Sequence, residues 1–177
     1  VREIKARRPD MLVEALIPDF QGDLDAVRMV VDSGVDVLDH NIETVERLQG
    51  TVRDRRAGYA QSLKVLRGAK EVRPDLFTKS SIMLGLGETR SEVIAAMQDL
   101  RANRVDIVTV GQYLRPSNWH LAVQKYVPPE VFEELRLAGE SIGFAYVAAG
   151  PLVRSSYRAG EFFLEKVLRE RKRVPAG

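Results

Sequence analysis

Residues 77–110, FTKSSIMLGLGETRSEVIAAMQDLRANRVDIVTV, contain the pattern that decides the fold. The apolar stretches Phe77–Leu84 and Val105–Val110 each predict a buried strand. Between them, the segment Thr89–Ala102 predicts a helix, because its first residue is a threonine and Glu92 follows three positions later, as in a capping box. A strand, a helix and a second strand in this order predict two parallel strands joined by a helical crossover.

The same alternation continues on both sides of this unit. The predicted strands and helices before and after it are strands Met11–Ile17 and Val35–His40, helices Leu24–Asp32 and Tyr59–Val72, a helix from Pro128 to about Ile142, and a last helix over Glu161–Lys172. Thr44–Arg53 predicts a short polar helix or turn, and Phe144–Ala149 a fifth strand or an extended segment. The pattern favours a parallel sheet with helices outside it, either an open doubly wound sheet or the later part of a barrel. In both, ligands bind at the carboxyl ends of the strands.

Composition narrows the function classes. The 177 residues carry 27 Lys and Arg against 25 Asp and Glu, and 45% are hydrophobic, which suits a globular core. The one basic run, 169–173, reads better as a solvated helix end than as a nucleic-acid site. There is no apolar run of membrane length and no signal-peptide pattern, so we expect a cytoplasmic chain that binds neither nucleic acid nor membrane. The absence of cysteine excludes thiolate ligands and nucleophiles within this stretch.

Polar residues follow the strand of residues 35–40. Asp39, Asn41 and Glu43 share one face if the chain stays extended, and this combination suits a diol such as a ribose edge. Alternatively, Asn41 and Glu43 begin the next helix as caps. In the following strand, Lys79 is the one cation of an apolar run, so it either points into a pocket or extends to solvent.

The later strand ends are less specific. Gly85–Glu88 lacks the Gly-Lys-Ser/Thr of a phosphate loop, so its glycines either admit a non-phosphate ligand or form a tight turn. Gly111–Ser117 combines polar groups with Tyr113, as in a pocket rim, or Tyr113 belongs to the core. Gly150–Tyr157 is a weak nucleophile site, or a helix start capped by serine.

Five strings in the sequence carry a resemblance: HNIETV (40–45), YAQSL (59–63), TKSSIMLGLGET (78–89), VTVGQYLRPS (108–117) and GPLVRSSY (150–157). Together they resemble the lipoyl synthase family of radical S-adenosylmethionine enzymes. The similarity covers roughly 160 residues in order and spacing. Gly-Leu-Gly-Glu also occurs in the related biotin synthases, whereas Arg-Ser-Ser-Tyr is typical of lipoyl synthases.

The resemblance implies an α/β fold, namely the C-terminal part of a partial (β/α)6 barrel of the TIM type. It places strands three to six here, followed by a C-terminal helical segment. We expect one domain fragment, with the β/α units in residues 1–127 and the C-terminal helices and closing segment in 128–177. The chain departs from the family because it lacks the two N-terminal cysteine triplets. It is therefore expected to be inactive alone, and the loop 54–58 also differs from the usual form.

The activity implied by the resemblance is radical sulfur insertion at carbons six and eight of an octanoyl chain on a protein lysine. The implied cofactors are S-adenosylmethionine and two [4Fe–4S] clusters, one that cleaves S-adenosylmethionine and one that gives up sulfur. The implied partners are octanoylated lipoyl-carrier domains or H protein, and an electron donor such as ferredoxin or flavodoxin. The alternative is a catalytically silent barrel fragment that binds ligands without clusters; an unrelated enzyme acting on a phosphorylated substrate ranks lower.

The resemblance also implies roles for individual residues. One group would surround S-adenosylmethionine: Asn41 and Glu43 at the ribose and amino acid part, Ser62 with nearby Tyr59 at the methionine carboxylate, and Gln112 and Leu114 at the adenine. Lys79 would face the barrel interior near substrate or the second cluster. Ser156, or alternatively Ser155, would ligate the open iron of the second cluster through a hydroxyl oxygen, with Arg154 beside the negative cluster.

Overall fold

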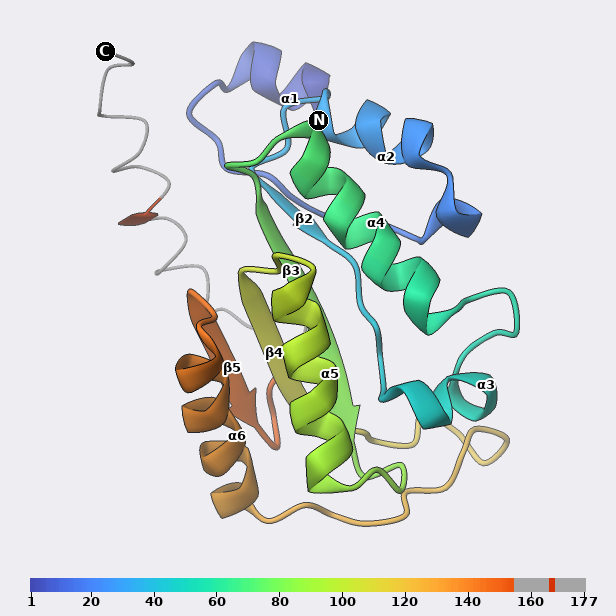
Figure 1. Ribbon diagram of the computed structural model, residues 1–177. Helices are drawn as coiled ribbons and strands as arrows, with labels where there is room; N and C mark the ends of the chain where they lie inside the picture. Colours follow the sequence, from blue (N-terminus) through green and yellow to red (C-terminus); the bar gives the residue numbers. More distant parts are fainter. Residues whose placement is uncertain (155–165, 168–177) are drawn as a thin grey trace.

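The computed structural model describes residues 1–154 and 166–167 (Figure 1). Its parallel sheet has the order β1-β2-β3-β4-β5. The strands are β1 (Glu14–Leu16), β2 (Val37–Asp39), β3 (Phe77–Leu84), β4 (Ile107–Gln112) and β5 (Tyr146–Gly150). The helices are α1 (Arg2–Arg7), α2 (Leu24–Val31), α3 (Gln49–Val52), α4 (Tyr59–Val72), α5 (Arg90–Ala102) and α6 (Pro129–Ile142), with 3-10 turns at Phe20–Gly22 and Glu46–Leu48.

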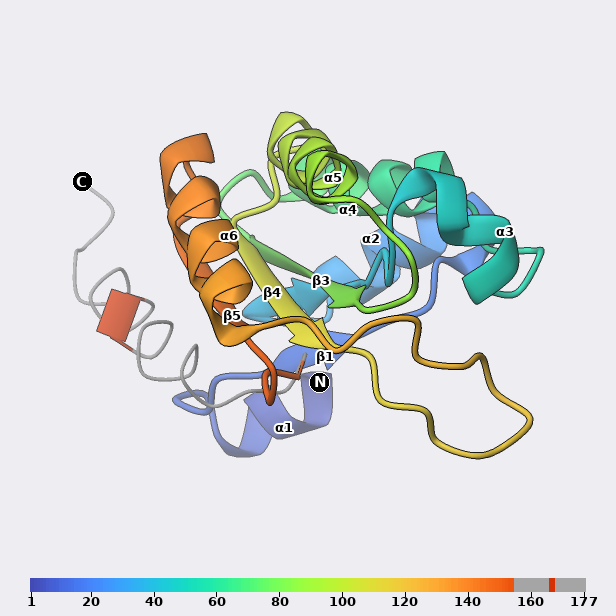
Figure 2. The same cartoon turned by 90° about the horizontal axis from the view of Figure 1, so that it is seen from below.

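The arrangement of strands and helices decides between the two architectures left open by the sequence. The strands follow one another in chain order without the reversal that a doubly wound sheet requires. Helices α2, α4, α5 and α6 lie along one face of the sheet (Figure 2). A parallel sheet whose connecting helices all lie on one side is a section of a barrel wall, so the predicted partial barrel of the TIM type is confirmed.

Helices α2 and α5 begin at a side chain that caps their first backbone amides, and α6 ends at a glycine. Asp23 accepts hydrogen bonds from the first amides of α2. Thr89 and Glu92 form the predicted capping box at the start of α5, where each side chain bonds the other residue's backbone amide. Gly143 ends α6 with a φ of 100°, the left-handed conformation that glycine adopts without strain. The helices predicted over 24–32, 59–72, 89–102 and 128–142 therefore form nearly as expected.

The strands differ more from the prediction than the helices do. β1 and β2 have three residues each, shorter than the predicted stretches. β1 pairs only with β2, and the pairing of β2 with β3 loses its regular register after Asp39. The segment left open as a strand or an extended piece forms β5, which pairs with β4. Residues 161–165 and 168–172 of the predicted last helix lie outside the described residues, and the division at residues 127 and 128 stays a prediction.

The two faces of the sheet have different chemistry because side chains alternate along each strand. On the helix side, Leu38, Ile82 and Val108 join the main core with helix residues such as Leu66 and Met97. On the other, inner face, a smaller apolar cluster of Val37, Phe77 and Ile107 is followed toward the carboxyl ends by polar side chains. This inner face corresponds to the inside of a barrel, and ligands bind at the carboxyl ends of its strands. In the described part of the chain, no helix is long and apolar enough to cross a membrane.

Candidate functional site

The site begins where β2 leaves its regular pairing. Asp39 pairs with Lys79, but Glu43 pairs with Ile82, so β2 and its continuation advance four residues while β3 advances three. The extra residue makes a bulge, and Glu43 has a φ of 65°, which is rare for a residue with a side chain. Ile42 donates its amide hydrogen to Ser80 Oγ inside the bulge. The segment is therefore bent rather than continuously extended, which differs from the geometry assumed in the sequence analysis.

The bulge leaves polar atoms available for a ligand. In the described residues, the buried atoms Asp39 Oδ1, Asn41 Oδ1 and Thr44 Oγ1 have no hydrogen-bond partner. Such atoms are rare in proteins and are usually satisfied by a bound molecule or water. The alternative that Asn41 and Glu43 cap the next helix is wrong, because no side chain caps the turn Glu46–Leu48. Asn41 instead hydrogen-bonds the Glu43 carboxylate, whose pKa burial raises.

A buried ionic cluster lies on the inner face beside these atoms. Lys79 Nζ is 2.5 Å from Glu14 Oε1 and 3.6 Å from Asp39 Oδ2. Lys79 is only 5% exposed, so it faces the inside of the sheet rather than extending to solvent. Burial raises the pKa of Asp39 to about 7, although the Lys79 ammonium opposes this rise. Asp39 is therefore a carboxyl group that can hold or release a proton near neutral pH.

A hydrogen-bond chain joins the end of β2 to helix α4. His40 Nδ1 lies 2.9 Å from the Ile17 carbonyl, and His40 Nε2 lies 2.9 Å from Ser62 Oγ. Because a carbonyl only accepts, Nδ1 carries the proton, and the Ser62 hydroxyl donates to Nε2. Burial lowers the pKa of His40, which agrees with this neutral ring. Arg53 Nη1 donates to the same Ser62 oxygen at 2.8 Å.

The hydrogen-bond chain includes Arg53, which nothing in the sequence marked as a site residue. Ser62 is fully buried, and its hydroxyl is shared between His40 and Arg53. The second acceptor of Arg53 Nη1, at 3.0 Å, is the amide oxygen of Gln49, so both of its fixed partners are uncharged. In the described residues the other guanidinium nitrogens make no hydrogen bond, although the charges of Asp19 and Glu43 lie close enough to interact with Arg53, so these nitrogens can donate to an anion. Only the folded connection between α3 and α4 brings Arg53 to Ser62.

Of the other residues predicted for the nucleoside site, Tyr59 and Gln112 make hydrogen bonds that hold parts of the fold together. Tyr59 donates its hydroxyl hydrogen to Asp99 Oδ2 of α5 at 3.0 Å, between two helices. Burial, with Asp99 nearby, raises the pKa of Tyr59. Gln112 Nε2 donates to the carbonyls of Tyr113 and Lys125, so its amide fixes the loop after β4. Leu114 is 47% exposed on that loop. Their assignments to the ligand stay predictions.

The Gly85–Glu88 turn has a structural reason for its glycines. Gly85 has a φ of 99°, and a Cβ there would lie 2.3 Å from Gln112 Nε2 and 2.4 Å from the Lys125 carbonyl oxygen. The Glu88 carboxylate accepts the amide hydrogens of Gly85 and Leu86. The turn is therefore closed by its own side chain and by the loop after β4, which supports the tight-turn alternative.

The chain after β5 crosses the inner face at the end of β4. A Cβ on Gly111 would lie 2.2 Å from the Val153 carbonyl oxygen, so the closing segment passes directly over this glycine. Arg154 Nη1 donates to the Val153 carbonyl at 2.8 Å and lies 3.5 Å from the Gln112 carbonyl. The arginine of Arg-Ser-Ser-Tyr therefore lies at the mouth of the sheet. Ser155 and Ser156, the proposed iron ligands, lie outside the described residues.

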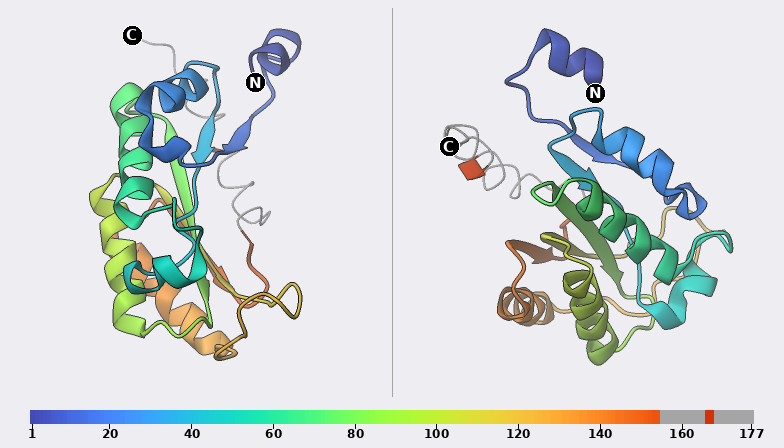
Figure 3. Two further views of the ribbon diagram at one scale, coloured as in Figure 1. Left: turned by 90° about the vertical axis from the view of Figure 1, so that its right-hand side faces the viewer. Right: turned by 45° about the horizontal axis from the view of Figure 1, so that its top comes forward.

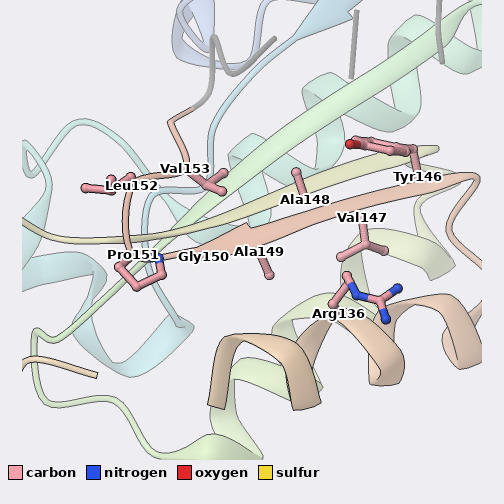
Figure 4. Close-up of a pocket in the computed structure, with 9 residues that line it drawn as sticks. All are labelled: Arg136, Tyr146, Val147, Ala148, Ala149, Gly150, Pro151, Leu152 and Val153. Carbon is pink, nitrogen blue, oxygen red and sulfur yellow. The ribbon is translucent and has the colours of Figure 1, made fainter. Parts of the chain in front are cut away.

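A separate hollow of about 500 Å³ lies along the free edge of β5. Arg136 of α6 and residues 146–153 line it (Figure 4). It does not include the polar cluster at the ends of β1, β2 and β3. The left view of Figure 3 shows helices α2, α4, α5 and α6 on one side of the sheet and α1 toward the other side. We place the candidate site at that cluster, because the unpartnered polar atoms and the buried charges are there.

Comparison with known proteins agrees with the sequence resemblance. Residues 1–100 match the model of the radical SAM superfamily. The chain is 54% identical over 173 residues to "Lipoyl synthase, apicoplast" of Plasmodium falciparum, covering 98% of this chain and 42% of that protein. It is 56% identical over 172 residues to "Lipoyl synthase, mitochondrial" of Phaeosphaeria nodorum, covering 97% and 46%. It is 59% identical over 172 residues to "Lipoyl synthase 2, chloroplastic" of Zea mays, covering 97% and 47%.

These relatives also correct one expectation and set a limit. The predicted cytoplasmic location is wrong, because the names of the relatives place them in the apicoplast, the mitochondrion and the chloroplast. The absence of a signal-peptide pattern carried no information about organelles. The chain spans less than half the length of the curated relatives that it matches.

Proposed function

The chain belongs to the radical SAM superfamily, and we propose that it is part of a lipoyl synthase, which inserts sulfur at carbons six and eight of a protein-bound octanoyl group. The observation that carries the proposal is the identity of 54–59% with three lipoyl synthases over 97–98% of this chain. The strand ends support it because they gather acceptors and charges of the kind that a nucleoside with an amino acid tail requires.

Membership in this superfamily implies a [4Fe–4S] cluster and S-adenosylmethionine. The sequence contains no cysteine, so these residues do not provide the thiolates that such clusters require. In the described residues, no group of histidine, aspartate and glutamate side chains could hold a metal ion either. We propose that the complete enzyme holds two clusters on cysteines that this sequence does not contain. Ser156, or alternatively Ser155, would supply a hydroxyl ligand to the second, with Arg154 next to it.

The residues at the end of β2 fit S-adenosylmethionine better than they fit the clusters. When bound, this molecule supplies the adenosyl group through which the superfamily abstracts hydrogen. Asn41 Oδ1 has no partner and can accept a hydrogen bond from a ribose hydroxyl, and the Glu43 carboxylate beside it can accept another. Asp39 Oδ1 is a third buried acceptor for a hydroxyl or an ammonium group.

Arg53 binds the carboxylate of the same ligand in this proposal. Its guanidinium is held by Ser62 and Gln49, so its orientation is fixed before the ligand arrives. A fixed guanidinium binds a carboxylate through paired hydrogen bonds with little loss of entropy. Ser62 therefore acts on the carboxylate through Arg53. Tyr59 supports the start of α4, and Gln112 and Leu114 shape the adenine side through the loop after β4.

Lys79 and Asp39 would act next to the substrate. The ammonium of Lys79 lies between the carboxyl groups of Glu14 and Asp39 on the inner face. The positive charge of Lys79 is therefore paired within the barrel interior. Asp39, with a pKa of about 7, can hold a proton at its carboxyl group near the ligand. The substrate would be the octanoylated lysine of a lipoyl-carrier domain or H protein, and ferredoxin or flavodoxin would provide electrons.

The direct test uses the complete enzyme, reconstituted anaerobically with iron and sulfide. It is incubated with S-adenosylmethionine, a reductant and a short peptide that carries octanoyl-lysine. We expect mass spectrometry to detect lipoyl-lysine, with two sulfur atoms in place of two hydrogens. Binding of S-adenosylmethionine without cleavage or sulfur insertion would support the silent binding module instead and would overturn the proposed activity.

A further inference from the structure

The loop after β4 presents large apolar side chains to solvent. We define it as the mouth loop, residues 113–127. Trp119 is 83% exposed and Tyr126 is 72% exposed, whereas Leu114 and Leu121 are 47% and 39% exposed. Exposed apolar side chains that gather in one segment mark an interaction surface more often than scattered ones do.

The mouth loop is held in place although it is exposed. Gln112 accepts the Val127 amide hydrogen at 2.9 Å and donates to the Lys125 carbonyl. The Gln124 amide donates to the Gly85 carbonyl at 2.8 Å, which fixes the loop to the end of β3. Within the loop, the Tyr113 hydroxyl donates to the Leu121 carbonyl at 3.0 Å. The loop is therefore held in one conformation, and its apolar side chains are exposed in that conformation.

Trp119 itself is oriented by its neighbours. Its ring stacks on the ring of His120 with centroids 3.8 Å apart. His120 Nδ1 lies 2.8 Å from Ser117 Oγ, so the second ring of the stack is also held. A rigid, exposed tryptophan loses little conformational entropy when a partner covers it, as in the anchor residues of protein interfaces.

The charge of the loop indicates the chemistry of its partner. The mouth loop contains Arg115 and Lys125 and no Asp or Glu, although cations and carboxylates are nearly balanced in the whole chain. The surface is thus aromatic and basic, and it is complementary to an acidic surface. It lies beyond the carboxyl ends of β3 and β4 (Figure 2), the end of the sheet that also carries the candidate site.

We propose that the mouth loop docks the folded, acidic face of the carrier domain whose octanoylated lysine enters the site. This proposal rests on the proposed function, because a macromolecular substrate must bind beside the mouth while its acylated arm reaches inside. Trp119 would be the apolar anchor, and Lys125 with Arg115 would orient the acidic face. Trp119, Arg115 and Lys125 would then contribute to the affinity for the carrier but not to the reaction of the octanoyl group.

The test compares two substrates of the complete, reconstituted enzyme: an octanoylated carrier domain and a short octanoyl-lysyl peptide. Trp119→Ala is expected to raise KM for the carrier about tenfold with kcat unchanged, while KM for the peptide stays within about twofold. In the described residues the Lys125 side chain makes no hydrogen bond or ion pair, and Lys125→Glu is expected to act in the same direction and to reduce the salt dependence. The matched control is Met29→Ala, because Met29 is 70% exposed on α2 in the outer helix layer.

The outcomes separate this proposal from the proposed function. Equal effects of both variants on carrier and peptide would assign the loop to the active site or to packing against the rest of the enzyme, and would overturn the docking role. An unchanged KM for the carrier would overturn it as well. Calorimetric binding of the carrier to enzyme without S-adenosylmethionine does not depend on turnover. If Trp119→Ala and Lys125→Glu weaken this binding, docking is supported, whether or not the substrates give product. The absence of product from both substrates would reject the proposed function instead.

Discussion

Gly111→Ala tests the path of the closing segment over the end of β4. The added Cβ would lie 2.2 Å from the Val153 carbonyl oxygen and 3.2 Å from its carbonyl carbon, and both belong to the backbone. Since non-bonded carbon and oxygen atoms rarely approach within about 3.2 Å, the segment must move by about 1 Å. Overpacking of this kind costs about 1–3 kcal/mol, and the higher strand propensity of alanine offsets about 0.5–1 kcal/mol. With the middle value of each range, we expect a net loss of about 1 kcal/mol in the free energy of unfolding.

The functional consequence follows from what comes next in the chain. Moving residues 150–154 displaces Arg154, which directly precedes the serines proposed as iron ligands, so sulfur insertion should fall more than cleavage of S-adenosylmethionine. The assays are urea unfolding and parallel measurement of methionine and lipoyl-lysine in the complete enzyme. The control is Gly50→Ala in α3, where an added Cβ meets nothing within 4 Å. Stability unchanged within about 0.5 kcal/mol and full sulfur insertion in Gly111→Ala would refute the reasoning.

Three further predictions address the site. Ser62→Ala removes one hydrogen bond that orients Arg53, and one charge-assisted hydrogen bond contributes about 1.5 kcal/mol. Calorimetry should therefore show S-adenosylmethionine binding weakened about tenfold. Unchanged affinity would show that Ser62 does not act on the ligand through Arg53. In the folded protein the pKa of Asp39 is raised to about 7, so its contribution to stability is complete below about pH 4 and is lost as the pH rises through 7. Asp39→Asn should remove this fall in the free energy of unfolding. Plots of that free energy against pH that run parallel for both proteins would contradict the raised pKa. Ser156→Ala should impair sulfur insertion more than methionine release, and equal losses would argue against an iron ligand.

The sequence predicted features that depend on neighbouring residues. The capping box of Thr89 and Glu92 and the apolar spacing over 59–72 are local, and both helices form as expected. Strand alternation predicted the parallel sheet, but it could not choose between a barrel section and a doubly wound sheet. That choice depends on which strands pair and on which face the helices cover, and only the folded chain shows both.

The site was harder to predict because it depends on contacts between distant segments. The bulge after Asp39 is visible only from its pairing with β3, and a one-residue extension changes which side chains share a face. Arg53 is nine residues before Ser62, in a polar stretch without periodicity, so nothing local marked it as a partner. Gln112 belongs to a stretch, Gly111–Ser117, with the composition of a pocket rim, but its side-chain amide holds the mouth loop through hydrogen bonds.

The most direct test of the central claim is a structure of the complete enzyme with S-adenosylmethionine bound. The account predicts the ribose within hydrogen-bond distance of Asn41 Oδ1 and the Glu43 carboxylate, and the methionine carboxylate on Arg53. A ligand bound elsewhere, for example in the hollow along β5, with Asn41 Oδ1 and Arg53 in contact only with water or protein, would contradict it.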